Sequence, residues 1–153
     1  MPTKTSANSS LKAVALVFGI CLFLVSFSLP AVGNLTGYEC AYYAIHYWRY
    51  DKQISSLALF GGWLNPQVLL MFFLSVYRAN PRLRAVLSVT ILFSIPMTWI
   101  AIHRMNAAGM FLDLKAGHFL WIAGILLIVI GSLPDLDAIR GRDVGNWLRS
   151  RTH

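Results

Sequence analysis

Four long apolar stretches, separated by short polar segments, occupy most of this chain. They run from about Ala13–Leu29, Leu57–Tyr77, Ala85–His103 and Gly117–Leu133. Each is about as long as a helix needs to cross ~30 Å of hydrocarbon, and none alternates polar and apolar residues as a strand does. Only helices and closed barrels satisfy their backbone in lipid. The pattern therefore predicts an all-α fold, a four-helix membrane bundle that forms one domain over residues 1–153.

Charged residues are few and unevenly placed. Hydrophobic residues make up 57% of the sequence, charged residues 12%, and the formal net charge is +7. Nine of the 13 basic residues lie in the two terminal segments and in the connection between the second and third stretches: Lys4, Lys12, Arg78, Arg82, Arg84, Arg140, Arg142, Arg149 and Arg151. The other four lie in the two remaining connections: Arg49, Lys52, Arg104 and Lys115.

This bias predicts the topology, because cytoplasmic loops are enriched in lysine and arginine. We expect both termini in the cytoplasm and a multi-pass protein of the bacterial inner membrane. The positive charge then serves topology and contacts with anionic lipids, and nucleic acid is not expected as a partner. The first stretch, at about 17 residues, is long for the apolar part of a signal peptide, so we expect a retained helix.

The connection after the first stretch is rich in aromatic residues. Tyr43, His46, Tyr47 and Tyr50 recur at helical spacing. The pattern predicts a helix that lies flat in the outer interface, with its aromatic rings at headgroup level. The alternatives are a lid over a lipid-like or quinone-like ligand and a docking surface for a neighbouring protein.

Prolines interrupt the second and third stretches at matching depth. Pro66 lies twelve residues before Arg78 and Pro96 twelve residues after Arg84, so each is about 18 Å from the cytoplasmic edge. Each proline leaves one carbonyl of its helix without a donor. The polar residues near the breaks are Asn65, Gln67, Ser94 and Thr98. Asn65, Pro66, Ser94 and Pro96 therefore mark either a ligand site between antiparallel helices or two plain hinges.

Three histidines are predicted at the outer face. His103 ends the third stretch, His118 opens the fourth, and His46 lies in the aromatic connection. Two histidines on facing helices could ligate a haem iron, as in small four-helix b-type cytochromes. Those proteins hold two histidine pairs at two depths, and these stretches contain no inner pair. Haem b is therefore an alternative; no other cofactor and no metal site is expected.

Glycines recur every seven residues in the fourth stretch, at Gly117, Gly124 and Gly131. Glycines on one stripe allow the backbone of a second helix to approach closely. We expect this stripe to face protein, either inside the bundle or in a partner or second copy. The aromatic connection is the other predicted partner surface.

Chemistry-bearing patterns are otherwise missing from the sequence. No acidic residue lies inside any stretch, and there is no phosphate-binding glycine loop, no H-E-x-x-H and no convincing catalytic triad. Cys40 stands alone outside the stretches, so paired-cysteine thiol oxidation is disfavoured. No catalytic residues are predicted, and an enzyme is disfavoured.

The segment Phe27-Ser28-Leu29-Pro30-Ala31, the following Gly-Tyr connection and Trp63-Leu64-Asn65-Pro66 resemble small uncharacterised four-helix proteins of the bacterial inner membrane. The resemblance covers about the first half of the chain and implies no activity. The sequence thus predicts a non-enzymatic accessory or structural subunit of a larger inner-membrane complex. The alternatives are a haem- or quinone-binding redox protein and an immunity protein against a membrane-active toxin.

Overall fold

The computed structural model describes residues 4–46, 52–107 and 113–134, with side chains described over the same ranges except 4–8, 52–61 and 105. The described residues form five helices and a two-stranded hairpin. The elements are α1 (Lys4–Ser26), β1 (Pro30–Val32), β2 (Leu35–Thr36), α2 (Gly37–His46), α3 (Lys52–Val76), α4 (Pro81–Ala107) and α5 (Ala116–Ser132). The all-α class is confirmed, and each predicted stretch corresponds to one of the helices α1, α3, α4 and α5.

Two of these helices are long and apolar enough to cross a membrane by length and composition, with apolar segments at Ser9–Ser26 and Pro81–Arg104. The apolar segments Gly62–Val76 and Ala116–Ser132 are shorter. The first stretch is helical only to Ser26. Beyond it, the segment around Pro30 leaves the helix and forms β1, because proline cannot donate to a helical carbonyl.

A tight turn joins α3 and α4 into an antiparallel hairpin of helices. Arg78 has a φ of 50° there. The Ala79 amide donates to the Leu74 carbonyl at 2.8 Å and the Arg78 amide to the Ser75 carbonyl at 3.2 Å, which is the Schellman pattern of a helix end. Asn80 then caps α4, because its side-chain oxygen accepts from the Arg82 amide at 2.9 Å and proline occupies the first helical position. We call this end of the molecule the turn end.

The opposite end, called the hairpin end, is tied together by backbone hydrogen bonds between segments far apart in sequence. β1 and β2 pair antiparallel, and Val32 forms a further bridge with Leu114. The Gly33 amide donates to the Asp113 carbonyl at 2.7 Å, and the Lys115 amide donates to the Ala31 carbonyl at 2.9 Å. The segment after α1 is thereby fastened to the segment before α5.

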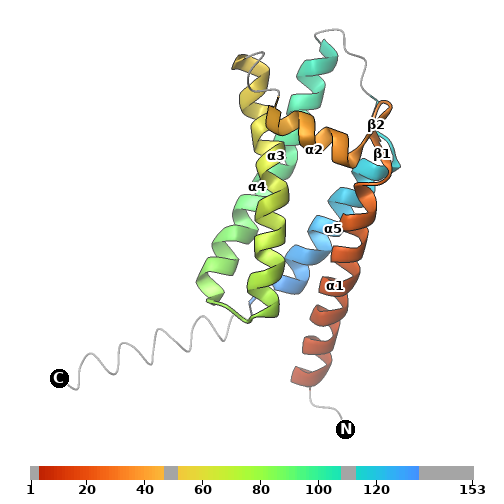
Figure 1. Cartoon of the computed structure of the whole chain (residues 1–153). Helices are drawn as coiled ribbons and strands as arrows, with labels where there is room; N and C mark the ends of the chain where they lie inside the picture. The colour runs from red at the N-terminus through yellow and green to blue at the C-terminus, as the bar shows by residue number, and fades with distance from the viewer. Residues whose placement is uncertain (1–3, 47–51, 108–112, 135–153) are drawn as a thin grey trace, which may run out of the picture.

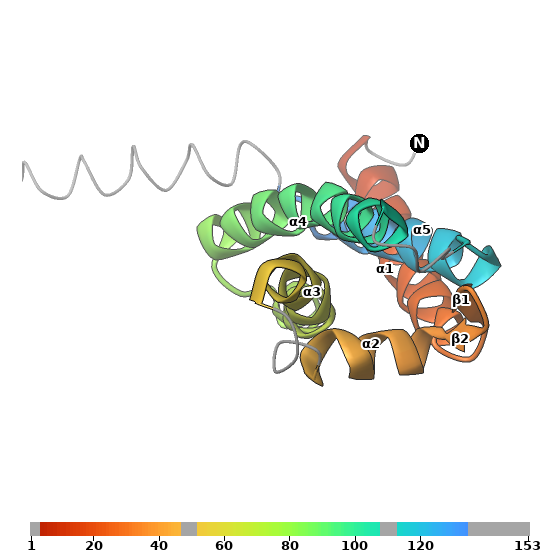
Figure 2. The same ribbon diagram turned by 90° about the horizontal axis from the view of Figure 1, so that it is seen from above.

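Helix α2 follows the hairpin and runs across the direction of the long helices, from the hairpin to α3, which extends beyond it (Figure 1). Thr36 and Glu39 form a capping box at its start. The Glu39 carboxylate accepts from the Thr36 amide at 2.8 Å, and the Thr36 hydroxyl oxygen accepts from the Glu39 amide at 3.3 Å. Seen from above, α2 bridges from the hairpin to α3 along one edge of the molecule (Figure 2).

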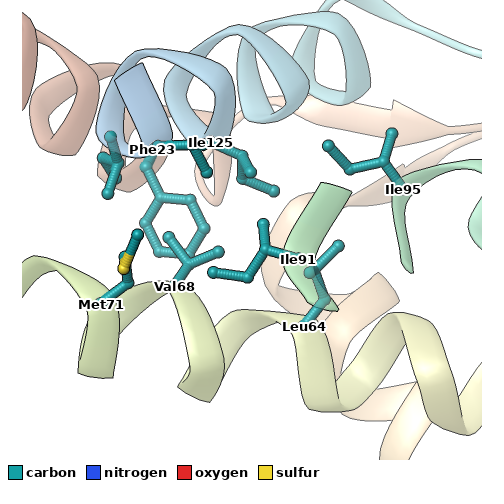
Figure 3. Close-up of a cluster of buried hydrophobic side chains, with 9 residues drawn as sticks. Phe23, Leu64, Val68, Met71, Ile91, Ile95 and Ile125 are labelled. Atoms are coloured by element: carbon teal, nitrogen blue, oxygen red, sulfur yellow. The ribbon is translucent and has the colours of Figure 1, made fainter. Parts of the chain in front are cut away.

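The long helices form two antiparallel pairs, α1 with α5 and α3 with α4, and α5 also contacts α3 and α4. Their buried side chains meet in one apolar core, part of which Figure 3 shows. The core consists of Phe23, Leu64, Val68, Met71, Ile91, Ile95, Ile125, Ile128 and Val129. Helix α5 contributes three of these residues and occupies the centre of the fold.

Candidate functional site

The proline break of α3 is linked to α5 through a side chain. Asn65 is half-buried, and its Oδ1 accepts a hydrogen bond from the indole Nε1 of Trp121 at 2.8 Å. Pro66 lies inside α3 on its exposed face. The side-chain amide of Asn65, next to the proline break, therefore has a hydrogen-bond partner within the chain.

The polar side chains near the proline break of α4 form hydrogen bonds within their own helix. The Ser94 hydroxyl, on a residue that is 3% exposed, donates to the Thr90 carbonyl at 2.8 Å. The Thr98 hydroxyl donates to the Ile95 carbonyl at 2.7 Å. Local bonding of this kind is common for serine and threonine in helices. Pro96 is exposed, so neither proline points into the core.

The polar side chains at the two breaks have separate hydrogen-bond partners, Trp121 for Asn65 and the Thr90 carbonyl for Ser94. Leu64, Ile91 and Ile95 lie between α3 and α4 as parts of the apolar core (Figure 3). Gln67 has a buried Oε1 without a hydrogen-bond partner. Of the four residues predicted as a ligand site or hinge, Asn65 turns to α5, Ser94 bonds to α4 itself, and the two prolines face outward.

His118 is buried at the start of α5 and receives a hydrogen bond from α4. Its side chain is 5% exposed, and its Nε2 accepts from the indole Nε1 of Trp99 at 2.8 Å. An indole nitrogen only donates, so the lone pair of Nε2 is engaged and the imidazole is neutral, with its proton on Nδ1. A haem iron would have to displace Trp99 to use that nitrogen.

The other two predicted haem histidines are exposed and lie on other elements. The Nδ1 atom of His46 lies 2.8 Å from the Tyr42 carbonyl oxygen, and its ring stacks on that of Tyr42 with centroids 4.1 Å apart. His103 is exposed near the end of α4. Within the described ranges, no three side chains of His, Cys, Asp or Glu gather in a group that could hold a metal ion.

Together these contacts form a small polar network in the half of the molecule nearer the hairpin end. It runs from Trp99 on α4 to His118 on α5, and from Trp121 on α5 to Asn65 on α3. The rings of His118 and Trp121 lie 5.7 Å apart. The network joins three helices by neutral hydrogen bonds, each of which contributes about 1 kcal/mol.

The two tryptophans of this network were not predicted from the sequence. A usable signal was present, because an indole N–H inside an apolar segment needs an acceptor when it is buried. Trp121 lies one helical turn after His118, so both fall on one side of α5. The acceptor on α3 could not be chosen without knowing which helices are neighbours.

The glycine stripe of α5 packs against α1. A Cβ atom on Gly124 would lie 2.7 Å from the Phe23 amide nitrogen and 2.9 Å from the Gly19 carbonyl oxygen. At Gly131 it would lie 2.8 Å from the Lys12 carbonyl oxygen. At Gly117 it would lie 2.6 Å from the carbonyl oxygen of Pro30, just beyond α1. The stripe is therefore covered from within the chain, and Gly19 of α1 completes it from the other side.

The aromatic helix α2 has an exposed surface. Tyr38 is 65% exposed, and Tyr42, Tyr43 and Ile45 are each close to half exposed. Tyr47 and Tyr50, also predicted on this helix, lie outside the described residues. Helix α2 begins at Gly37, before Tyr43, the first residue of the predicted pattern.

Two titratable groups at the start of α2 are perturbed. Hydrogen bonds from the Thr36 amide and then from its hydroxyl hold the pKa of Glu39 below its usual value. Burial raises the pKa of the Cys40 thiol, which keeps it protonated and unreactive near neutral pH. This part of the fold therefore offers a cap and a packed thiol, and no activated nucleophile.

Comparison of the chain with protein-family models, with curated proteins and with solved structures finds no match.

Proposed function

We propose that this chain is a four-span protein of a bacterial inner membrane, in which it acts as a non-enzymatic accessory or structural subunit of a larger complex. The spans are α1, α3, α4 and α5. With 25 residues α3 is about 37 Å long, and with 17 residues α5 is about 25 Å long. The shorter α5 fits a bilayer that thins locally around it.

The observation that supports membrane embedding is the apolar surface. Large hydrophobic side chains are exposed on all four long helices, and water-soluble proteins rarely expose contiguous apolar patches of this extent. Examples that are more than half exposed are Val14, Val17, Phe18, Phe73, Val86, Val89, Phe93, Phe119 and Ile130. In a bilayer these side chains lie against lipid tails at no cost.

The orientation follows from charge. Lys12, Arg78, Arg82 and Arg84 belong to the turn end, and Arg104 and Lys115 to the hairpin end. The turn end is therefore cytoplasmic by the positive-inside rule. Helix α2 then lies in the outer headgroup region, where tyrosine rings are favourable. Reporter fusions at Arg82 and at His153 should both indicate the cytoplasm, and a periplasmic signal at either position would refute this topology.

A scaffold role is favoured because polar groups of α3, α4 and α5 form hydrogen bonds within the chain. Asn65 accepts from Trp121, His118 accepts from Trp99, and Ser94 bonds to its own helix. Paired groups of this kind hold helices together and leave little to recognise a substrate. Since α1 covers the glycine stripe of α5, the contact with a partner protein is proposed for the exposed aromatic surface of α2, formed by Tyr38, Tyr42, Tyr43 and Ile45.

Co-purification in a mild detergent tests this proposal. A tagged full-length chain should retain a stoichiometric partner, and Tyr38→Ala combined with Tyr42→Ala should lose it. The matched control is Phe93→Ala, which removes an exposed ring from α4, far from α2 in sequence. A monomer without a partner, or equal loss of the partner in both variants, would contradict the subunit role. A Soret band in the purified protein would instead favour the haem alternative.

A further inference from the structure

A hydrogen bond joins α4 to α5 at the hairpin end, and it requires a neutral histidine. The indole Nε1 of Trp99 donates to the Nε2 of His118 at 2.8 Å. An indole nitrogen can only donate, so the lone pair of Nε2 is the acceptor. Histidine side chains ordinarily take up a proton near a pH of about 6.5. A proton that binds Nε2 takes this same lone pair and therefore ends the hydrogen bond.

Protonation would also leave a charge where water cannot hydrate it. His118 is 5% exposed, and the centroid of its ring lies 6.0 Å from that of Phe119 and 5.7 Å from that of Trp121. A buried charge without a partner is costly. With both ring nitrogens protonated, Nε2 and the Trp99 nitrogen would also be two donors that face each other. Separation of α4 from α5 relieves both costs, because it admits water to the ring.

The contact between α4 and α5 is small for both helices. Helix α4 packs mainly against α3, and α5 packs mainly against α1. The hydrogen bond from Trp121 to Asn65 joins the same two helix pairs close to His118. The hairpin end is therefore where the pair α3 and α4 can part from the pair α1 and α5.

Helix α2 spans the boundary between the two pairs (Figure 2). At its start, the Gly37 amide donates to the Leu29 carbonyl, just beyond α1, at 3.0 Å. Towards its other end it packs on α3, where a Cβ atom on Gly62 would lie 3.1 Å from the Cγ1 of Ile45. A helix that is attached to both pairs has to shift when the pairs part.

Other titratable groups lie at the same end of the molecule. Asp113 and Lys115, just before α5, form an ion pair at 3.9 Å. β1 and the described side chains of α3 contribute none. His46 and His103 can titrate in the same mildly acidic range as His118, and both are exposed. The remaining groups on the elements that pack against α5 are Cys21 of α1, Glu39, Cys40 and the tyrosines of α2, and Arg104 of α4.

We propose that His118 is a pH-sensitive latch between α4 and α5. At neutral pH it accepts from Trp99, and the hairpin end is closed. At mildly acidic pH on the outer side of the membrane it is protonated, α4 separates from α5, and α2 shifts with its exposed aromatic surface. The latch rests on the proposed function, because it regulates the partner site on that surface and releases the partner in acid.

A distance between α4 and α5 tests the latch in the purified full-length chain, without a partner. Spin labels are attached at Ile100→Cys and Ala116→Cys, two exposed positions, in a chain that also carries Cys21→Ala and Cys40→Ala. The distance is measured in a mild detergent at a pH of about 7.5 and of about 5, which bracket the ordinary range of histidine. It should lengthen in acid by about 3 Å or more, the space that one inserted water needs.

Variants assign this change to His118. His118→Gln keeps an acceptor that does not titrate, so its distance should stay short at both pH values. His46→Gln and His103→Gln replace exposed histidines in the same way and should respond as the wild type does. If His118→Gln does not fold, Trp99→Phe serves instead, and without the donor its distance should already be long at neutral pH. Equal wild-type distances at both pH values, a full acid response of His118→Gln, or a short distance in Trp99→Phe would each overturn the latch.

Retention of the co-purified partner at the same two pH values tests the regulation. The wild type should lose most of its partner in acid, whereas His118→Gln should keep it. Equal loss from both proteins would exclude regulation by His118. A wild type without a partner at either pH would refute the proposed function, and the measured distances would still decide whether the latch exists.

Discussion

Replacing Gly124 by alanine tests how closely α1 and α5 must approach each other. The added Cβ would lie 2.7 Å from the Phe23 amide nitrogen and 2.9 Å from the Gly19 carbonyl oxygen. Ordinary contacts between such atoms begin near 3.4 Å, so the two helices must separate by roughly 0.7 Å. Both opposing atoms belong to the backbone, and no side-chain rotation can relieve the clash.

The expected loss of stability follows from two opposing terms. Overpacking costs about 1–3 kcal/mol, and a clash with backbone belongs at the upper end. Alanine recovers up to about 1 kcal/mol of helix propensity over glycine. The net loss is therefore about 2 kcal/mol, which corresponds to a Tm lower by about 4–8 °C for a chain of this size.

Gly62→Ala provides the control, with the opposite expected sign. Its Cβ would lie 3.1 Å from the Cγ1 of Ile45, a side-chain atom that can move. The same gain in helix propensity then makes this variant neutral or slightly more stable. Thermal unfolding in mild detergent, followed by circular dichroism, measures the stability of both variants against the wild type. A Gly124→Ala protein as stable as Gly62→Ala would show that the close approach of α1 and α5 is not required.

Three further predictions concern single contacts. Trp121→Phe leaves the Oδ1 of Asn65 without its donor and should destabilise the protein by about 1–3 kcal/mol in denaturant titrations. Arg78→Gly should stabilise it by about 0.5–1 kcal/mol in the same titrations, because arginine is strained at a φ of 50°; a loss of stability would contradict this. Hydrogen bonds from Thr36 lower the folded-state pKa of Glu39. The ionised Glu39 carboxylate therefore stabilises the fold fully above the usual pKa of 4.5, and this stabilisation is lost as the pH falls through the lowered value. The stability difference between wild type and Glu39→Gln should vanish over that acidic range, and a difference that persists there would refute the assignment.

The helices could be predicted from the sequence because a long run of apolar residues has few other solutions. The side of each helix that faces the interior could not be predicted from the sequence. Val89 and Ile91 are neighbours of similar hydrophobicity, yet Val89 is 68% exposed and Ile91 is fully buried. Where the exposed face is also apolar, the helical periodicity that marks a buried side in soluble proteins disappears.

The candidate site was harder to predict than the helices. The short connection between the second and third stretches predicted that Pro66 and Pro96 lie on neighbouring helices, but the rotation of each helix decides where the side chains point. That rotation turned Asn65 toward Trp121 of α5 and both prolines outward. The hairpin was missed because β1 and β2 are three and two residues long, too short to show alternation.

The pairing of α1 with α5 has a consequence for biogenesis. Of the described helices, α1 comes first in sequence and finds its main partner in the last, α5, and Lys12 meets Leu133 only across 121 positions of chain. In the proposed membrane arrangement, Gly19 has only lipid or the insertion machinery against it until α5 is synthesised. Assembly of this fold is therefore expected to complete after translation, and chains truncated before Gly117 should be targets for membrane proteases.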